Sequence, residues 1–240
     1  MSLYRLKKGA SLMKKWSDIS LNGLQLKLLG WFFTLFHLAS LLFFPEGDSP
    51  IAMALSIVGY MALPIFAFLL VEGFAYTESR IRYMIFLLAA AVLTEPFYDY
   101  WHCGTWFDFE ASNGQNILFA YVIGIVQLHF ISSMGTRAPI RAVLTVIMVV
   151  SSAVWMDILN IPCGSTIQLL VGVFYLLHER PRLKNWVAAA LGLFRQITPA
   201  LMIPVLTRYN DEPGEYNKYI FYIAYPLVWI VAVMLKMFVF

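Results

Sequence analysis

Eight apolar runs dominate the sequence and limit what the chain can fold into. Several reach the roughly 20 residues that a helix needs to cross about 30 Å of hydrocarbon. Only helices and closed barrels satisfy all backbone polar groups in lipid, so the runs predict membrane-spanning helices. The third and sixth runs are short, and tilted or incomplete spans are expected there. The runs are Gln25–Phe44, Ile51–Tyr76, Tyr83–Tyr98, Asn116–Ser133, Ala142–Asn160, Ser165–His178, Trp186–Leu206 and Tyr219–Phe240.

The composition favours the same fold class. Only 13% of the residues are charged, against about 25% in soluble domains. The mean hydropathy is +0.72. No linker or internal repeat separates the runs. We therefore expect an all-α, polytopic transmembrane helical bundle of about eight helices. A basic cytoplasmic segment would occupy residues 1–24, and a single transmembrane domain residues 25–240.

The lysines and arginines predict the orientation of this bundle. With eight spans, 14 of the 17 fall on the side of the N-terminus, Lys236 among them. Arg208 and Lys218 fall on the far side, and Arg195 lies within a run. Cytoplasmic connections carry such an excess, so we expect a cytoplasmic N-terminus and a multi-pass protein of the inner (plasma) membrane. Because membrane topology accounts for the positive charge, membrane lipids are expected partners and nucleic acid is not.

Polar residues recur along one face of the first run. Lys27, Gly30, Thr34, His37 and Ser40 are spaced by three or four residues, so this face should point into the bundle. A buried histidine can exchange protons near neutral pH. His37 is therefore a candidate base, and the alternative is a histidine that serves packing alone.

Four charged residues lie within or at the ends of other runs, where charges are costly and often functional. Glu72 lies near the cytoplasmic end of the second run, and Glu95 and Asp157 lie near the outer ends of the third and fifth. Snorkelling of these acids to an interface is the alternative. Arg195 lies about halfway along its run and needs an acid partner or water.

Arginines near the inner ends of the runs are candidates for holding the phosphates of a nucleotide-bearing donor. They are Arg80, Arg82 and Arg137, and the alternative is a role in topology alone. The sequence has no glycine-rich phosphate loop, HExxH, GxSxG or cysteine-rich motif, so no metal site is expected. Cys103 and Cys163 fall near connections on one side of the membrane, and a disulfide between them is left open.

Five segments resemble the TraX family of bacterial membrane proteins, in the family's order and spacing. The resemblance extends over nearly the whole chain from the first run onward. The segments are Phe33–Ser40 (FTLFHLAS), Pro64–Tyr76 (PIFAFLLVEGFAY), Leu93–Tyr98 (LTEPFY), Gly114–Gly124 (GQNILFAYVIG) and Phe221–Leu227 (FYIAYPL).

The resemblance implies a membrane acyltransferase. The family is named after a protein that acetylates the N-terminus of pilin, and it is similar to enzymes that carry acyl groups from cytoplasmic acyl-CoA across the bilayer. His37 matches the family's histidine in the first helix. Glu72, Gln115, Asn116 and Asp157 match other polar positions of the family.

The sequence departs from the family pattern at two positions. Phe36 stands where the family often has an acid beside the histidine, and Val228 stands where it often has a histidine. These departures leave open how His37 is oriented and which acceptor is used.

These observations lead to one mechanistic expectation. Acyl transfer needs a base and a group that stabilises the oxyanion. The donor would be acetyl-CoA or another acyl-CoA, and the acceptor a peptide, a sugar or a lipid. A proton-coupled transporter or a membrane assembly factor is the alternative. The expected catalytic residues are His37, Asp157, Glu95 and Asn116; the expected substrate-binding residues are Gln115, Glu72 and Arg195; and the expected donor-binding residues are Arg80, Arg82 and Arg137.

Overall fold

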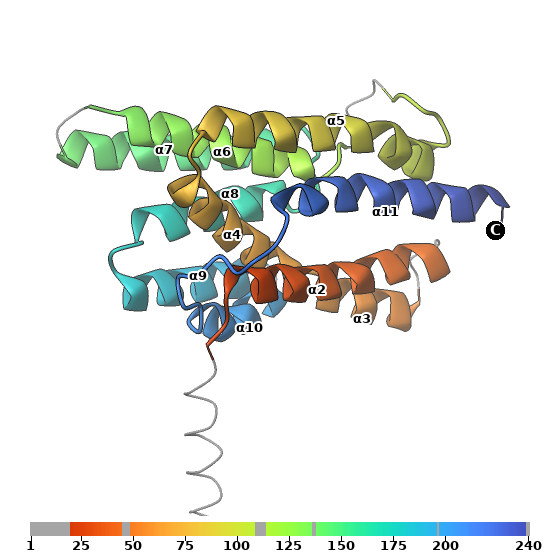
Figure 1. The fold of residues 1–240 in the computed structure, drawn as a ribbon, viewed down its shortest axis with the longest axis horizontal. Helices are drawn as coiled ribbons and strands as arrows, with labels where there is room; N and C mark the ends of the chain where they lie inside the picture. Colours follow the sequence, from red (N-terminus) through yellow and green to blue (C-terminus); the bar gives the residue numbers. More distant parts are fainter. Residues whose placement is uncertain (1–19, 45–48, 109–113, 136–137, 196, 239–240) are drawn as a thin grey trace, which may run out of the picture.

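The computed structural model describes residues 20–44, 49–108, 114–135, 138–195 and 197–238. The regular elements in these ranges are α-helices, which lie roughly along one common direction apart from the inclined α4 (Figure 1). The helices are α2 (Gly23–Phe43), α3 (Pro50–Gly59), α4 (Ala62–Tyr76), α5 (Arg80–Cys103), α6 (Leu118–Ser133), α7 (Ala138–Ile158), α8 (Gly164–Leu176), α9 (Pro181–Arg195), α10 (Ile197–Leu206) and α11 (Lys218–Phe238).

The predicted transmembrane helical bundle is confirmed, whereas the count of eight spans is not. Within the described residues, five helical segments are long and apolar enough to cross a membrane, and α6 and α8 are shorter apolar helices. Their outward side chains are apolar, as on α7, where Val143, Ile147 and Val154 are exposed. Such a surface requires lipid around it. The five segments are Gly23–Phe43, Pro50–Tyr76, Arg80–Cys103, Pro139–Ile158 and Tyr219–Phe238.

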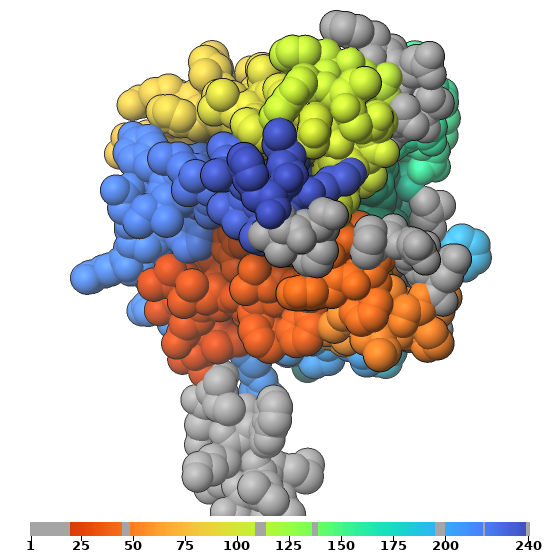
Figure 2. All heavy atoms as spheres, turned by 90° about the vertical axis from the view of Figure 1, so that its right-hand side faces the viewer, coloured from red at the N-terminus to blue at the C-terminus, as the bar shows by residue number. Residues whose placement is uncertain are grey.

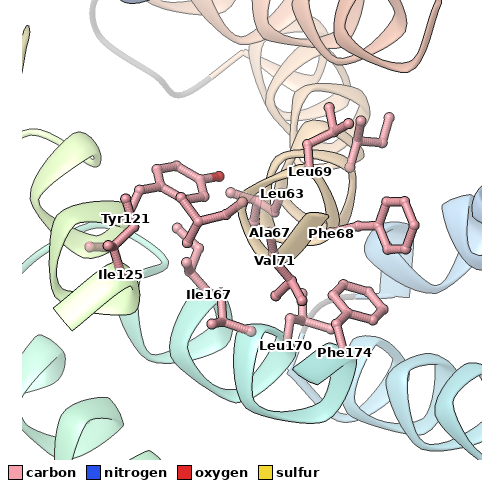
Figure 3. Close-up of a cluster of buried hydrophobic side chains, with 14 of the residues drawn as sticks. Leu63, Ala67, Phe68, Leu69, Val71, Tyr121, Ile125, Ile167, Leu170 and Phe174 are labelled. Atoms are coloured by element: carbon pink, nitrogen blue, oxygen red, sulfur yellow. The ribbon is translucent and has the colours of Figure 1, made fainter. Parts of the chain in front are cut away.

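Helix α4 forms the centre of the bundle. It packs against α2, α6, α8 and α10, and 11 of its 15 residues are buried. A helix that is apolar on every side is stable only when other helices surround it. Figure 3 shows side chains of α4 meeting those of α6 and α8 in the core. The labelled residues are Leu63, Ala67, Phe68, Leu69, Val71, Tyr121, Ile125, Ile167, Leu170 and Phe174.

The second membrane segment is broken between α3 and α4. Tyr60 and Met61 form a turn there, and Met61 N donates to Val58 O at 3.1 Å. Pro64 falls in the first turn of α4, where its missing N–H removes no helical hydrogen bond. Broken helices occur at membrane depth where protein or a polar interior surrounds them. The break is therefore a place to look for a site.

Helices α9 and α10 form a tight hairpin that enters and leaves at one end of the bundle. A Cβ on Gly192 would lie 2.7 Å from the Ala200 nitrogen, so the two helices approach closely. The chain leaving α10 returns to the start of α2, where Leu21 N donates to Arg208 O at 2.8 Å and Gly23 N donates to Glu212 O at 2.7 Å. We call the end that holds Gly23 the inner end.

This arrangement corrects the predicted topology of the last third of the chain. The connection after α10 was expected on the far side, but it lies at the inner end because the run Trp186–Leu206 folds back on itself. Helix α11 then runs parallel to α5 instead of antiparallel. Phe86 stacks with Tyr219 near the inner end, with ring centres 5.3 Å apart, and Trp101 contacts Trp229 farther out.

The corrected topology separates the basic residues more fully than the expected one. Arg208 and Lys218 move to the inner end, and Lys236 moves to the outer end. Figure 2 views the bundle from the outer end, where the dark blue end of α11 lies between yellow α5 and the red and orange α2 and α3. Arg208 and Lys218 thus no longer contradict the excess of positive charge at the inner end, and only Lys236 becomes a new exception. The change supports the cytoplasmic assignment of the inner end.

Candidate functional site

The polar face of α2 points into the bundle, as its spacing predicts. A Cβ on Gly30 would lie 2.8 Å from the Phe66 ring, and the Ser40 hydroxyl donates to Ala52 O at 2.8 Å. Lys27 donates to the Tyr216 hydroxyl and lies 3.8 Å from the centre of that ring. This face therefore carries the contacts of α2 with α3, α4 and the connection before α11.

His37 lies against the break between α3 and α4. A Cβ on Gly59 would come within 2.6 Å of the His37 Cβ, so only glycine allows this approach. The His37 ring also lies beside Tyr60, with ring centres 5.9 Å apart. Its Nδ1 atom is buried and has no hydrogen-bond partner in the described chain. A buried polar atom normally has one, so this nitrogen is available to a ligand or water.

Glu95 and Asn116 form one hydrogen-bonded unit between α5 and the start of α6. Glu95 Oε2 accepts from the Asn116 main-chain nitrogen at 3.2 Å and also from its side-chain nitrogen. That side-chain nitrogen donates to Ala91 O at 2.9 Å as well, and Asn116 Oδ1 accepts from Leu118 N at 3.0 Å. Asn116 is 0% exposed, and both its amide nitrogen and its amide oxygen are engaged in these hydrogen bonds. Asn116 thus positions Glu95, and its amide hydrogens are not free to stabilise an oxyanion.

Asp99 and His102 extend this acidic face of α5 toward the outer end. Asp99 follows Glu95 by one turn and accepts from Asp108 N at 2.9 Å. His102 lies in the last turn, where its Nδ1 is 2.9 Å from Tyr98 O. The sequence analysis did not select His102, although its i, i+4, i+7 spacing with Glu95 and Asp99 was a signal.

Aromatic side chains connect this part of α5 with α2 through α11. His102 stacks on Tyr98 with ring centres 4.2 Å apart, and Trp229 lies 5.8 Å from His102. The Trp229 ring in turn contacts the ring of Tyr225, which lies beside Trp31 of α2.

A second group of titratable residues lies at the inner end. Glu72, only 5% exposed, has a buried Oε2 without a hydrogen-bond partner in the described chain. Its electrostatic neighbours are Lys184 of α9 and His178 and Asp211 in connections. Sequence spacing did not predict this group, because the α9–α10 hairpin brings its members together.

Aromatic rings and burial shape the inner group. The Lys184 ammonium lies 5.3 Å from the centre of the Phe68 ring, and Tyr209 stacks edge-on against the same ring at 5.3 Å. Burial lowers the pKa of Lys184 and raises the pKa of Tyr209 to about 12. Glu72 lies 12 positions beyond Tyr60, or about 18 Å along a helix, and so belongs to a different site from His37.

The predicted donor-binding arginines differ in their surroundings. Arg80 donates to the Ser132 hydroxyl at 3.0 Å, and its guanidinium lies 4.3 Å from the centre of the Phe74 ring. Arg82 is exposed near the same end. Arg137 lies outside the described residues. Arg80 thus joins α5 to α6, whereas Arg82 is the more accessible candidate for a phosphate.

Three further expected site residues have different outcomes. Asp157 lies exposed in the last turns of α7, whereas Glu95 is the acid that the fold brings to Asn116. Gln115 is half-buried immediately before Asn116. Arg195 is the last residue of α9, and its side chain lies outside the described part of the structure.

Comparisons with known proteins agree with the resemblance seen in the sequence. The chain matches the model of the family described as TraX protein over residues 23–236. It is also 26% identical over 239 residues to a "Probable fimbrial assembly protein FimC, serogroup H1" of Dichelobacter nodosus, which covers 88% of this chain and 93% of that protein. No solved structure matches the chain. Because the family match runs from the first residue of α2 into the last turn of α11, this chain belongs to the TraX family.

Proposed function

We propose that this protein is an integral-membrane acyltransferase of the inner membrane. It transfers an acetyl group from cytoplasmic acetyl-CoA to the N-terminus of a pilin-like peptide or to a sugar. The observation that carries the proposal is the buried, unpartnered Nδ1 of His37 beside a broken helix. Membership of the TraX family and the fimbrial assembly named for the relative support a pilin-associated role.

His37 acts as the general base in this proposal. It takes a proton from the acceptor's amine or hydroxyl as that group attacks the acyl carbon. Glu95, held by Asn116, supplies a negative charge on the acceptor side of the bundle. Because Asn116 is fully hydrogen-bonded, the oxyanion is assigned to Gln115 or Arg195.

The donor and the acceptor approach from opposite ends of the bundle. Arg82 holds the phosphates of CoA at the inner end, and Arg80 adds charge while it joins α5 to α6. Arg137, which lies outside the described residues, is a further candidate for this role from the sequence. The flexible arm of CoA carries the thioester toward His37. The acceptor enters at the outer end, where Asp99 and His102 lie.

A second candidate function is that of an assembly factor without enzymatic activity. The name of the Dichelobacter nodosus relative, a probable fimbrial assembly protein, favours it. In that case His37 would pack the break between α3 and α4, and its replacement would change complex formation with a pilin without any turnover of acyl-CoA.

Release of CoA from labelled acetyl-CoA separates the two candidates. The purified protein in nanodiscs is incubated with labelled acetyl-CoA and a pilin N-terminal peptide, and both label transfer and free thiol are measured. We expect transfer by the wild type and a loss of about 10²–10⁴-fold in His37→Gln, the usual contribution of a general base. His129→Gln is the matched control, since His129 lies near the other end of α6 from Asn116.

Two results would count against the enzyme. Absence of CoA release with peptide, sugar and lipid acceptors, from protein that still binds a pilin, would favour the assembly factor. Wild-type transfer by folded His37→Gln would reduce His37 to a packing residue.

A further inference from the structure

Two buried glutamine side chains each have one amide atom without a hydrogen-bond partner in the described residues. Gln168 of α8 is 0% exposed, and its Nε2 donates to Ala120 O of α6 at 2.6 Å, so its Oε1 is the unpartnered atom. Gln127 of α6 is 3% exposed, and its Oε1 accepts from the Ser152 hydroxyl of α7, so its Nε2 is the unpartnered atom. One of these atoms is therefore an acceptor and the other a donor.

The packing of α6 against α8 brings the two atoms to the same place. A Cβ on Gly124 would lie 3.8 Å from Gln168 Oε1, so this oxygen faces α6 at a residue without a side chain. Gln127 follows Gly124 by three residues and shares its face of α6. Side chains of a helix lean toward its N-terminus, so the Gln127 amide extends back toward Gly124. The acceptor and the donor both lie beside this glycine.

Helix α7 closes the third side of this position. It runs antiparallel to α8 and touches it at two glycines, one turn before and one turn after Gln168. Ser152 lies between the two α7 residues that these glycines touch, so its hydroxyl is level with the Gln168 amide. Measured from a Cβ on each glycine, the contacts are Gly164 with Met156 Cβ at 2.8 Å and Gly172 with Val149 Cγ2 at 2.7 Å.

We propose that a water molecule is bound between α6, α7 and α8, where it accepts from Gln127 Nε2 and donates to Gln168 Oε1. The oxygen of Ser152, at the same level, accepts its second hydrogen. Buried waters typically make about three hydrogen bonds to polar groups that the protein leaves unpaired. The proposal concerns how the bundle is held together, and it does not depend on acyl transfer.

The chemistry of the position selects water over other occupants. A lipid chain offers no hydrogen bond, and a cation would be repelled by the donor Nε2 of Gln127. The close contacts of α7 with α8 on either side of Gln168 restrict the occupant to a small molecule. An unpaired amide atom is especially costly where water does not surround the helices. A molecule that both donates and accepts removes this cost at both glutamines.

This water would help to hold α7 in the bundle. In lipid, helices associate through close packing at small residues and through hydrogen bonds between helices, because hydrocarbon surrounds them in any case. Helix α7 exposes many apolar side chains on its other face, and it meets α8 at two glycines. The water adds hydrogen bonds that connect all three helices at one level.

Solid-state NMR on the wild-type chain tests the site directly. The full chain, with ¹⁵N in the side chains of asparagine and glutamine, is reconstituted in liposomes, and transfer of magnetisation from water protons to each side-chain amide is measured. We expect transfer to Gln127 Nε2, whose signal is identified by its loss in Gln127→Met. Asn116 is the matched control, because it is also 0% exposed but its amide nitrogen donates to Ala91 O and Glu95. It should receive no transfer.

Two results of this measurement would overturn the proposal. Contact of the Gln127 amide with the Gln168 side chain, without transfer from water, would show that the two glutamines pair directly. Transfer from lipid acyl protons in place of water would show that the position is open to the bilayer.

A double-mutant cycle tests whether the two glutamines share one partner. Gln127→Met and Gln168→Met should each lower the folding equilibrium constant roughly ten- to a hundredfold, because each leaves the water and the other amide short of a hydrogen bond. The double variant should lose less than the product of the two, since both unpaired groups are then removed. Unfolding in detergent is the measurement, and losses that simply multiply would contradict a shared site.

Thr145 provides the control for this cycle. It is a buried residue of α7, and its hydroxyl donates to Arg141 O of the same helix at 2.8 Å. The effects of Thr145→Val and Gln168→Met should therefore multiply. Coupling of this pair as strong as that of the two glutamines would show that the cycle reports a general loosening of α7, which would count against the water site.

Discussion

The ammonium of Lys236 donates a hydrogen bond to the main-chain carbonyl of Trp101 at 2.6 Å. The contact joins the last turn of α11 to the last turns of α5, and Lys236 also lies 5.0 Å from the centre of the Trp101 ring. A cation near the carbonyl end of a helix is favourable. Because α5 ends at the outer end of the bundle, the contact places the end of α11 there as well.

The topology predicts which positions an impermeant thiol reagent can reach. In a protein with Cys103 and Cys163 replaced by serine, Thr105→Cys should react in intact cells. Ser79→Cys and Asp211→Cys should react only after lysis, because the connection after α10 pairs with Leu21 at the inner end. Labelling of Asp211→Cys in intact cells would restore the eight-span topology expected from the apolar runs.

Gly59 predicts a strict size limit beside His37. In Gly59→Ala, the new methyl group would meet the His37 Cβ at 2.6 Å, so α2 and α3 must separate. Overpacking of this kind typically costs about 1–3 kcal/mol, and acyl transfer should fall with the displacement of His37. Thermal unfolding and turnover are the measurements. Gly135→Ala is the control, because nothing lies within 4 Å of a Cβ there, and equal effects of the two changes would contradict this role of Gly59.

Asn116 predicts a large difference between a buried and an exposed asparagine. Asn116→Ala removes the side-chain hydrogen bonds to Glu95 Oε2, Ala91 O and Leu118 N, and leaves Glu95 only the bond from the main-chain nitrogen of residue 116. Each buried polar group left unpaired costs about 1–3 kcal/mol. Asn217→Ala removes only an exposed contact to Tyr219 N, and a lost cap costs about 1 kcal/mol. In detergent, Asn116→Ala should therefore be much less stable to unfolding than Asn217→Ala. A reversed order of stability would show that Asn116 does not hold Glu95.

The two inner arginines should separate donor binding from stability. Arg82→Ala should weaken binding of acetyl-CoA roughly ten- to a hundredfold, from the loss of one charge-assisted contact worth about 1.5–3 kcal/mol. Arg80→Ala should also lower the unfolding temperature, because it removes the contacts with Ser132 and Phe74. Calorimetry and thermal unfolding measure the two effects. Unchanged affinity in folded Arg82→Ala would leave that residue a determinant of topology alone.

The sequence predicted the parts of the site that depend on a single helix. The spacing of Gly30, His37 and Ser40 placed them on one face, and that face meets α3 and α4. Asn116, which the family resemblance selected, is likewise buried. Helical periodicity and the cost of polar groups in lipid are local properties, and a sequence reports them directly.

The sequence did not predict which residues of different helices contact one another. Asp157 and Glu95 were equal candidates for the acid, and the fold brings Glu95 to Asn116 and leaves Asp157 exposed. His102 was missed, because the ring that packs against it from another helix, that of Trp229, comes from α11. Spacing along one helix does not say which other helix will face it.

The sequence by itself determined that this chain is a membrane-embedded helical protein, because 20-residue apolar runs have few other stable states. It also determined on which side of the membrane most connections lie, because the lysines and arginines that mark cytoplasmic connections can be read directly from the sequence. Only the tertiary structure decided that the run Trp186–Leu206 folds back as a hairpin and that α11 runs parallel to α5. An apolar run satisfies its backbone whether it crosses the bilayer or turns within it. The choice depends on contacts such as those of Gly192 with Ala200 and of Leu21 with Arg208.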